Sequence, residues 1–298
     1  MPDKEEEPVA VPPGFSRTAA AFQVDEITEH HIYRSLAAVE KNAHNKEILE
    51  RMAGEELGHY RVWKQYTGRD VGPDRVRAWA YSMLARVLGI TFALKLMEKK
   101  EKGAVSLYRS LGGTVPEAAE VIAQEEHHEM EVLALLDEER LRYAGSIVLG
   151  LNDALVEFTG SLAGFTFALQ DTRIIAAVGF ITGIAASLSM ASSEYLSQKS
   201  DRTREDPLRA AFYTGIAYII TVILLVSPFL LVPQPFAALM VTLGAALAVI
   251  VFFTYYTSVA GDLPFLKRCA EMAVLSLGIA GISFLIGLAV RVAFQVSV

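Results

Sequence analysis

Five long apolar runs in the C-terminal half of the chain restrict it to folds that lie largely inside a lipid bilayer. Each run approaches the ~20 residues that an α-helix needs to cross the hydrocarbon core. Five consecutive buried helices of this length would require an unusually large core in a water-soluble protein. The sequence therefore predicts five membrane spans. They are approximately Ala144–Leu169, Ile174–Leu196, Ala210–Leu231, Pro235–Tyr256 and Ala270–Val290.

The charged residues divide the 298-residue chain into a polar part and an apolar part. Residues 1–143 hold 44 of the 61 Asp, Glu, Lys and Arg side chains, and residues 144–298 hold the other 17. The net charge of −7 argues against a nucleic-acid partner, because nucleic acids bind basic faces. A single cysteine, Cys269, excludes an internal disulfide, a CxxC redox motif and a four-cysteine metal site.

The start of the chain is acidic and rich in proline, with no apolar stretch of the kind found in a signal peptide. Such a composition favours disorder. We therefore expect residues 1–18 to form a disordered tail, residues 19–143 to form a first domain, and residues 144–298 to form the membrane domain.

Apolar residues recur with a period near 3.6 through the first domain, which predicts helices rather than strands. Residues 75–88 form a short amphipathic stretch between the second and third of four longer helices. The expected fold class is all-α, with a four-helix bundle followed by a five-helix transmembrane domain. The four longer helices are expected at Asp25–Val39, Asn45–Tyr66, Ile90–Leu111 and Glu117–Arg142.

Glutamate and histidine residues recur at one-turn spacing in these helices. Glu56 and His59 form one such pair, and spacing alone does not decide between Glu125 and Glu126 in the last helix. Inward carboxylates from four helices, together with histidine, hold two metal ions in bundles of the ferritin type. This donor set suits iron or manganese. The predicted ligands are Glu26, Glu56, His59, Glu98, Glu101, Glu126, His128 and Glu129.

The spacing of these residues resembles that of the rubrerythrin branch of the ferritin-like superfamily. The matching elements are Glu26-x6-Tyr33, Glu56-x-x-His59, Glu98-x-x-Glu101 and Glu126-x-x-Glu129. The resemblance implies a non-haem di-iron centre that reacts with oxygen or peroxide, with Mn²⁺ or Zn²⁺ as alternative metals. The chain lacks the four-cysteine rubredoxin module, so a peroxidase role would need an external electron donor. The roles of Glu29, His30 and His31 stay open.

Polar residues interrupt the first two apolar runs. Asp153 and Glu157 lie one turn apart in the first run, as do Met190 and Glu194 in the second. Ionisable residues inside a membrane segment indicate a functional path by default. A polarizable thioether also suits a partly dehydrated transition-metal ion. We expect these four residues to line a path for Fe²⁺ or Mn²⁺. Alternatively, Met190 is a packing residue and Glu194 an interfacial one.

The distribution of positive charge predicts the orientation of the spans. The connection Ser197–Arg209 holds four basic residues, whereas Val232–Gln234 holds none. By the positive-inside rule, the first domain is cytoplasmic and the C-terminus lies outside the cytoplasm. The expected location is the inner (cytoplasmic) membrane of the cell, crossed several times.

Two stretches of the membrane domain resemble the vacuolar iron transporter family. They are Gly150-Leu151-Asn152-Asp153-Ala154-Leu155-Val156-Glu157, and Ser187-Leu188-Ser189-Met190 followed by Glu194-Tyr195-Leu196-Ser197. The resemblance implies five spans, a homodimer with its pore at the interface, and Asp153 and Met190 as pore ligands. Plant-type members carry a Glu-rich helical insert after the second span, where this chain has a short basic linker. The whole chain therefore looks like a membrane-bound ferritin of the bacterial or archaeal kind.

Together these features predict an exporter of ferrous iron, with manganese as a possible second substrate. The cytoplasmic di-iron bundle would bind, sense or oxidise the metal. The competing hypothesis is a membrane-anchored di-iron oxidase or peroxidase whose spans act only as an anchor. Anchoring needs one span, so five spans with internal carboxylates favour transport. Whether the bundle has ferroxidase activity is left open.

Overall fold

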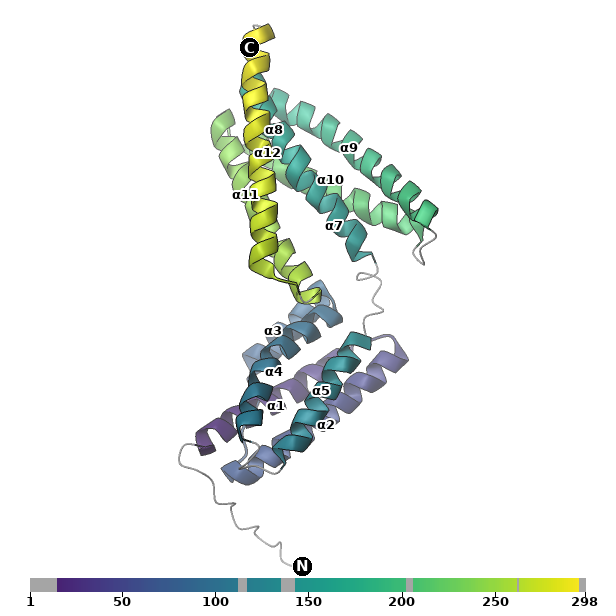
Figure 1. Ribbon diagram of the computed structural model, residues 1–298, viewed down its shortest axis with the longest axis vertical. Helices are drawn as coiled ribbons and strands as arrows, with labels where there is room; N and C mark the ends of the chain where they lie inside the picture. The colour runs from purple at the N-terminus through teal and green to yellow at the C-terminus, as the bar shows by residue number, and fades with distance from the viewer. Residues whose placement is uncertain (1–14, 112–116, 135–142, 202–205, 262, 295–298) are drawn as a thin grey trace, which may run out of the picture. The chain divides into compact units, whose positions relative to one another are not determined.

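The computed structural model describes residues 15–111, 117–134, 143–201, 206–261 and 263–294. In this described part the protein is all-α, with no strand, as the sequence predicts (Figure 1). The chain divides into two compact units, Met1–Glu138 and Glu139–Val298. The division falls a few residues before the boundary expected from the sequence.

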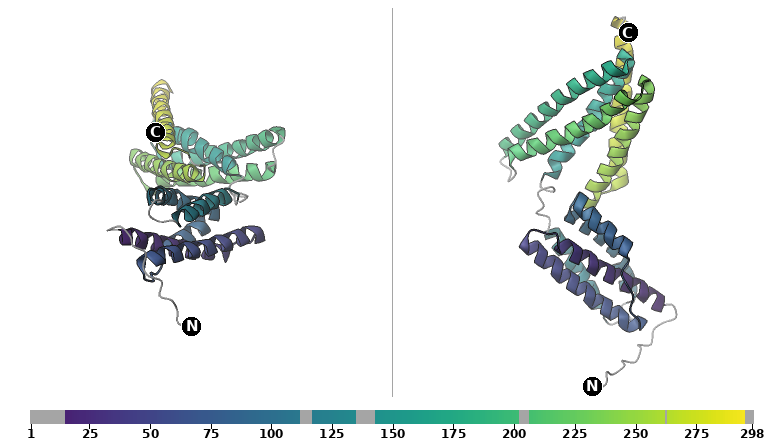
Figure 2. Two further views of the ribbon diagram at one scale, coloured as in Figure 1. Left: turned by 60° about the horizontal axis from the view of Figure 1, so that its bottom comes forward. Right: turned by 180° about the vertical axis from the view of Figure 1, so that it is seen from behind.

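The described residues of the first unit form five helices, of which α1 and α2 run side by side (Figures 1 and 2). In addition, α4 packs on α5, and α3 contacts both α1 and α4. Asn42 caps the start of α2 by accepting hydrogen bonds from two backbone amides, and Gly68 ends α2 in the left-handed conformation that favours glycine. The helices are α1 (Phe15–Ala37), α2 (Ala43–Thr67), α3 (Arg75–Leu88), α4 (Ile90–Leu111) and α5 (Ala118–Ala134).

The first helix of this unit starts earlier than the sequence predicts, at Phe15 rather than Asp25. Helix α1 begins at Phe15, so residues 15–18, expected in the disordered tail, are helical. The rest of that tail, residues 1–14, lies outside the described residues. The last helix is described only to Ala134, so its expected extension to Arg142 is also outside them.

Four helices of the second unit are long and apolar enough to cross a membrane, counting only the residues that the structure describes. They are α9 (Thr172–Asp201), α10 (Pro207–Leu231), α11 (Pro235–Ala260) and α12 (Phe265–Phe294). The expected first span consists of three consecutive elements with a wider π-helical turn in the middle. They are α7 (Ala144–Asp153), the turn η1 (Ala154–Phe158) and α8 (Thr159–Leu169). Its role as a fifth span stays a prediction.

Small residues let the helices of the second unit approach closely, as is usual for helices packed in lipid. A Cβ atom added at Gly150 on α7 would lie 2.4 Å from the carbonyl oxygen of Thr214 on α10. A Cβ atom at Gly287 on α12 would lie equally close, 2.4 Å, to the carbonyl oxygen of Gly164 on α8. Both contacts are possible only because neither residue has a side chain.

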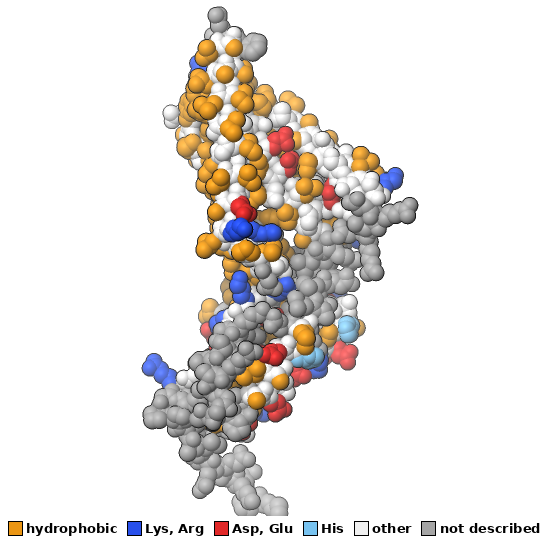
Figure 3. Space-filling model, in the orientation of Figure 1, with side chains coloured by type: hydrophobic (Ala, Val, Ile, Leu, Met, Phe, Trp, Pro, Cys, Tyr) orange, Lys and Arg blue, Asp and Glu red, His pale blue; other side chains and the backbone are white. Residues whose placement is uncertain are grey.

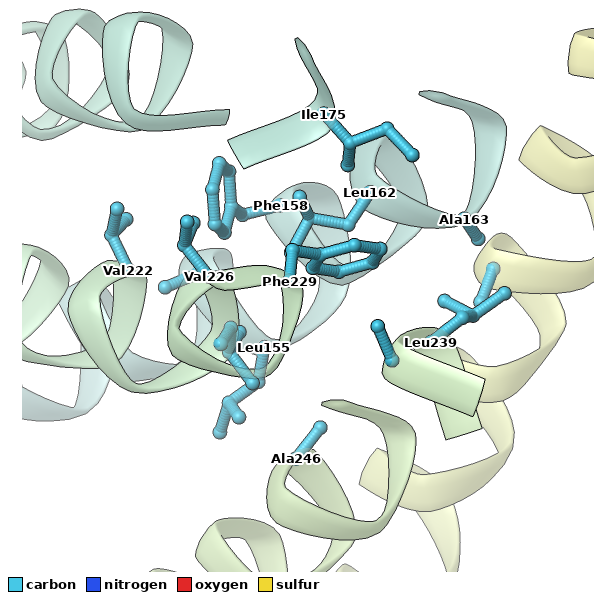
Figure 4. Packing of buried hydrophobic residues seen from close by; sticks show 14 of the residues in the cluster. Leu155, Phe158, Leu162, Ala163, Ile175, Val222, Val226, Phe229, Leu239 and Ala246 are labelled. Carbon is cyan, nitrogen blue, oxygen red and sulfur yellow. The ribbon is translucent and has the colours of Figure 1, made fainter. Parts of the chain in front are cut away.

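An apolar core fills the space between the helices of the second unit (Figure 4). It includes Phe158 from the π-helical turn, Leu162 from α8, and three residues of α10. These are Val222, Val226 and Phe229. Many large apolar side chains also point outward over α9 to α12 (Figure 3). Outward apolar faces of this extent suit contact with lipid rather than water.

Candidate metal sites

In the first unit, four buried residues from three helices converge on one point. They are Glu26 on α1, Glu56 and His59 on α2, and Glu125 on α5, whose ligand atoms all lie within 4.8 Å of one another. The Nδ1 atom of His59 lies 3.1 Å from Glu125 Oε1, 3.4 Å from Glu56 Oε2 and 3.5 Å from Glu26 Oε2. We name these four residues, together with His128, the bundle cluster.

His128 on α5 lies beside two glutamates of the bundle cluster that also lie beside His59. Its Nδ1 atom lies 3.2 Å from Glu56 Oε1 and 3.6 Å from Glu125 Oε2, and its ring is fully buried. Glu56 and Glu125 therefore each face both histidines. In this arrangement the two carboxylates could each share a metal ion with either histidine.

Side chains around the bundle cluster orient the ligands. Gln124 Oε1 lies 2.7 Å from Nε2 of His59, and Glu55 Oε2 lies 2.5 Å from Nε2 of His128. If each Nε2–H donates to its partner, both Nδ1 atoms point their lone pairs into the cluster. Trp63 also donates from Nε1 to Glu26 Oε1 at 3.0 Å. Residue spacing within single helices did not predict these three partners.

The donor atoms of the bundle cluster are of the kind that hold a metal ion. Both carboxylate oxygens of Glu56, one of Glu125 and the Nδ1 atoms of both histidines are buried, and none has a hydrogen-bond partner of good geometry among the described residues. Buried acceptors without donors are costly unless cations satisfy them. Oxygen and imidazole donors of this kind suit iron or manganese.

One predicted ligand is replaced by its neighbour. Glu126 is exposed, whereas Glu125 is buried in the bundle cluster, so Glu125 takes the place of Glu126 among the candidate ligands. Adjacent residues of a helix point about 100° apart, and only one of them can face the site. Glu98 is buried on α4 but does not belong to the four converging residues. The side chains of Glu101 and Glu129 lie outside the described residues.

The residues that the sequence left open have other contacts. Glu29 is buried, and its Oε1 lies 3.5 Å from a guanidinium nitrogen of Arg77. The Nδ1 atom of His30 lies 2.5 Å from the carbonyl oxygen of Ala53, and His31 is exposed. The described contacts of these three residues do not connect them to the bundle cluster.

The crowded charges of the bundle cluster shift its protonation equilibria. Burial raises the pKa of Glu26 to about 8, and neighbouring carboxylates add to this effect. Burial acts to lower the pKa of His128, but Glu125 and Glu56 outweigh it and raise that pKa to about 11. The pKa of His59 is raised by the same balance, with burial opposed by Glu125, Glu26 and Glu56. At neutral pH the metal-free cluster therefore holds protons on these groups.

Metal loading of the bundle cluster is expected to release protons. Glu26, His59 and His128 all have raised pKa values and are protonated near neutral pH, but each must lose its proton to bind a metal ion. Affinity should therefore rise with pH through the neutral range and fall on acidification. Calorimetry with Mn²⁺ in buffers of different ionisation enthalpy would count the released protons. Affinity and heat that are both independent of pH and buffer would contradict this prediction.

In the second unit, the two residues of the first apolar run that are predicted to line the metal route, Asp153 and Glu157, lie at the π-helical turn. Asp153 ends α7 and is half-buried, and its Oδ2 atom is buried with no hydrogen-bond partner among the described residues. Glu157 lies in the turn and is exposed. Single π-helical turns inside α-helices are frequent at functional sites.

A hydroxyl from a distant helix stabilises this turn. Ser276 on α12 donates from Oγ to the carbonyl oxygen of Leu155 at 2.5 Å, in a fully buried position. The wide turn disturbs the regular pattern of backbone bonds, and the serine satisfies one carbonyl there. The hydroxyl of Tyr218 on α10 is also buried, with no hydrogen-bond partner among the described residues. The sequence analysis did not identify Ser276 or Tyr218.

The two path residues of the second run have different surroundings. Met190 is half-buried and packs against the apolar core of the second unit. Glu194 is buried, and its Oε1 atom accepts hydrogen bonds from Ser146 Oγ at 2.7 Å and from Gln198 Nε2 at 2.9 Å. The contacts of Glu194 therefore join α7 to α9. Whether Met190 and Glu194 bind a metal ion stays a prediction.

One comparison with known proteins gives a match, and it covers part of the second unit. A search of curated proteins found no match to the chain. Residues 144–206, about a fifth of the chain, match the family model described as VIT family. The matched segment contains α7, the π-helical turn, α8 and α9, and hence both polar pairs of the path. Together with the apolar helices, the match supports a membrane domain that resembles the vacuolar iron transporters.

Proposed function

We propose that this protein exports ferrous iron, and also manganese, from the cytoplasm, and that Asp153, Glu157, Met190 and Glu194 line the route. The observation that carries the proposal is the match to the VIT family over the segment that holds all four residues. Asp153 offers a buried oxygen without a donor, which suits a cation that has lost part of its water shell.

The first unit serves this export as a di-metal bundle. Two-metal helical bundles of the ferritin type take one Glu from each of two helices and a Glu-x-x-His pair from each of the other two. Here α2 supplies Glu56 and His59, α5 supplies Glu125 and His128, and α1 supplies Glu26. Glu98, buried on α4, is the candidate for the remaining carboxylate. Four carboxylates would neutralise two divalent ions, so the bundle would hold iron ahead of its export.

The orientation of the protein in the membrane and its assembly are proposed from the distribution of basic residues and from the exposure of Glu157. We place the bundle in the cytoplasm and the protein in the inner membrane, because the basic residues lie in the connection between α9 and α10. We further propose a homodimer in which each copy contributes Asp153 and Met190 to a shared pore. The exposure of Glu157 in a single copy suits a position at such an interface.

Cells that express the protein test this function. In cells loaded with ferrous iron, the full chain should lower the metal content and raise iron tolerance relative to an empty vector. Membrane abundance is measured in the same cells. Unchanged iron content in cells with abundant membrane-inserted protein would overturn the export proposal.

A further inference from the structure

Helix α3 carries an apolar stripe on its outer side that no described residue covers. Val76, Trp79, Met83 and Val87 are 77%, 65%, 37% and 64% exposed. Their spacing of three or four residues places them on one face of the helix. The opposite face packs inward, where Ala85 is buried and Tyr81 contacts the apolar core of the bundle. The exposed stripe is therefore not needed to hold the bundle together.

The charges of α3 are unusual for this protein. The helix contains three arginines and no acidic residue, although the whole chain has a net charge of −7. Arg77 pairs with Asp25 and Glu29 inside the bundle. Arg75 and Arg86 are exposed beside the apolar stripe. The outer face of α3 is thus both apolar and basic.

A hollow lies along this face. It has a volume of about 440 Å³, and Arg75, Arg86, Trp79, Ser82 and His31 are among its lining residues. Burial, followed by the nearby His30, Arg34 and Arg75, lowers the pKa of His31, so this surface is electropositive even without a charge on His31. Guanidinium groups beside hydroxyl groups suit the phosphate of a lipid headgroup.

We infer that α3 is an interfacial helix that lies on the anionic surface of the bilayer, with Trp79 in the headgroup region and Arg75 and Arg86 on lipid phosphates. Amphipathic helices with an aromatic apolar face and basic flanks bind membranes in this way. In sequence, only residues 135–143 lie between the described end of α5 and the start of α7 in the apolar unit, so the bilayer is present at high effective concentration. In a symmetric dimer the outer face of α3 would meet the same face of the second copy, and the arginines would repel each other, whereas an anionic bilayer attracts them.

The two tryptophans of the chain make the inference testable with the full-length protein. Trp63 is fully buried, and the membrane helices contain no tryptophan. Tryptophan emission is measured in vesicles of equal parts phosphatidylcholine and phosphatidylglycerol, with and without bromine on the acyl chains of the phosphatidylcholine. Bromine should quench the wild-type emission, and the Trp79→Phe variant should lose this quenching. Equal quenching in wild type and Trp79→Phe would overturn the inference. So would a shielded Trp79 that bromine does not reach, which would indicate a second copy or another part of the chain on the stripe.

The basic residues are tested against a matched control. Each arginine near an anionic surface contributes about 1 kcal/mol, so Arg75→Gln and Arg86→Gln should each weaken lipid association by about fivefold. Arg61→Gln removes an exposed arginine of α2 and should change nothing. Removing phosphatidylglycerol from the wild-type vesicles should have the same effect as the double variant. Quenching that responds to neither the variants nor the lipid charge would overturn the role of the arginines.

Discussion

Replacing Asp153 by Asn is expected to abolish metal transport while the bundle still loads with metal. A dehydrated divalent cation needs fixed negative charge, and an amide of the same shape does not supply it. Two unit charges 4 Å apart interact by about 4 kcal/mol at an effective dielectric constant of 20, so removing one should slow transport by at least about a hundredfold. The measurement is iron uptake into vesicles that hold the purified variant, compared with wild type.

Asp171 provides the matched control for this experiment. It lies outside the apolar helices and caps the start of α9 by accepting hydrogen bonds from the amides of Arg173 and Ile174. Asparagine caps helices about as well as aspartate, so Asp171→Asn should transport like wild type. Full transport by Asp153→Asn would reduce the apolar helices to an anchor and favour a di-iron oxidase.

The second large effect is expected in the bundle. Glu125→Ala and Glu56→Ala should each prevent binding of two metal ions, because both carboxylates face both histidines. Loss of an outer partner alone usually lowers metal affinity by roughly 10–100-fold, and loss of a direct ligand should cost at least as much. Helical content should stay close to wild type, since removing crowded carboxylates relieves repulsion in the metal-free bundle.

The neighbour of Glu125 is an internal control. Glu126 is exposed on the same helix, so Glu126→Ala should bind metal with wild-type stoichiometry. Metal content per chain and circular dichroism are measured on all three full-length variants. Equal loss of metal in Glu125→Ala and Glu126→Ala, or no loss in Glu125→Ala and Glu56→Ala, would contradict the assignment of the bundle cluster.

The sequence predicted the helices and four of the five residues that converge in the bundle cluster, because helical periodicity and one-turn spacing are local properties. Apolar residues at a period near 3.6 indicate a helix, and Glu56 and His59, three residues apart, necessarily share a face. The choice between Glu125 and Glu126 depends on how far α5 is rotated against α1 and α2. That rotation is set by packing between helices distant in sequence, which spacing within one helix does not record.

The second unit also contains contacts between distant residues that local sequence patterns could not predict. The apolar runs predicted its long helices, but the π-helical turn beside Asp153 was not foreseen. Ser276, which bonds to this turn at Leu155, is 121 residues away in the chain. Glu194, expected to line the path, accepts a hydrogen bond from Ser146, 48 residues away. Such partners become visible only when the helices are placed together.

Ferrous-iron flux into vesicles tests the central claim of metal transport most directly. The full-length protein is reconstituted, iron is added outside under reducing conditions, and a chelating dye inside reports its arrival. We expect accumulation well above that of protein-free vesicles and of vesicles with Asp153→Asn, at equal protein content. Flux equal to that of protein-free vesicles, from a preparation whose bundle binds iron, would contradict it.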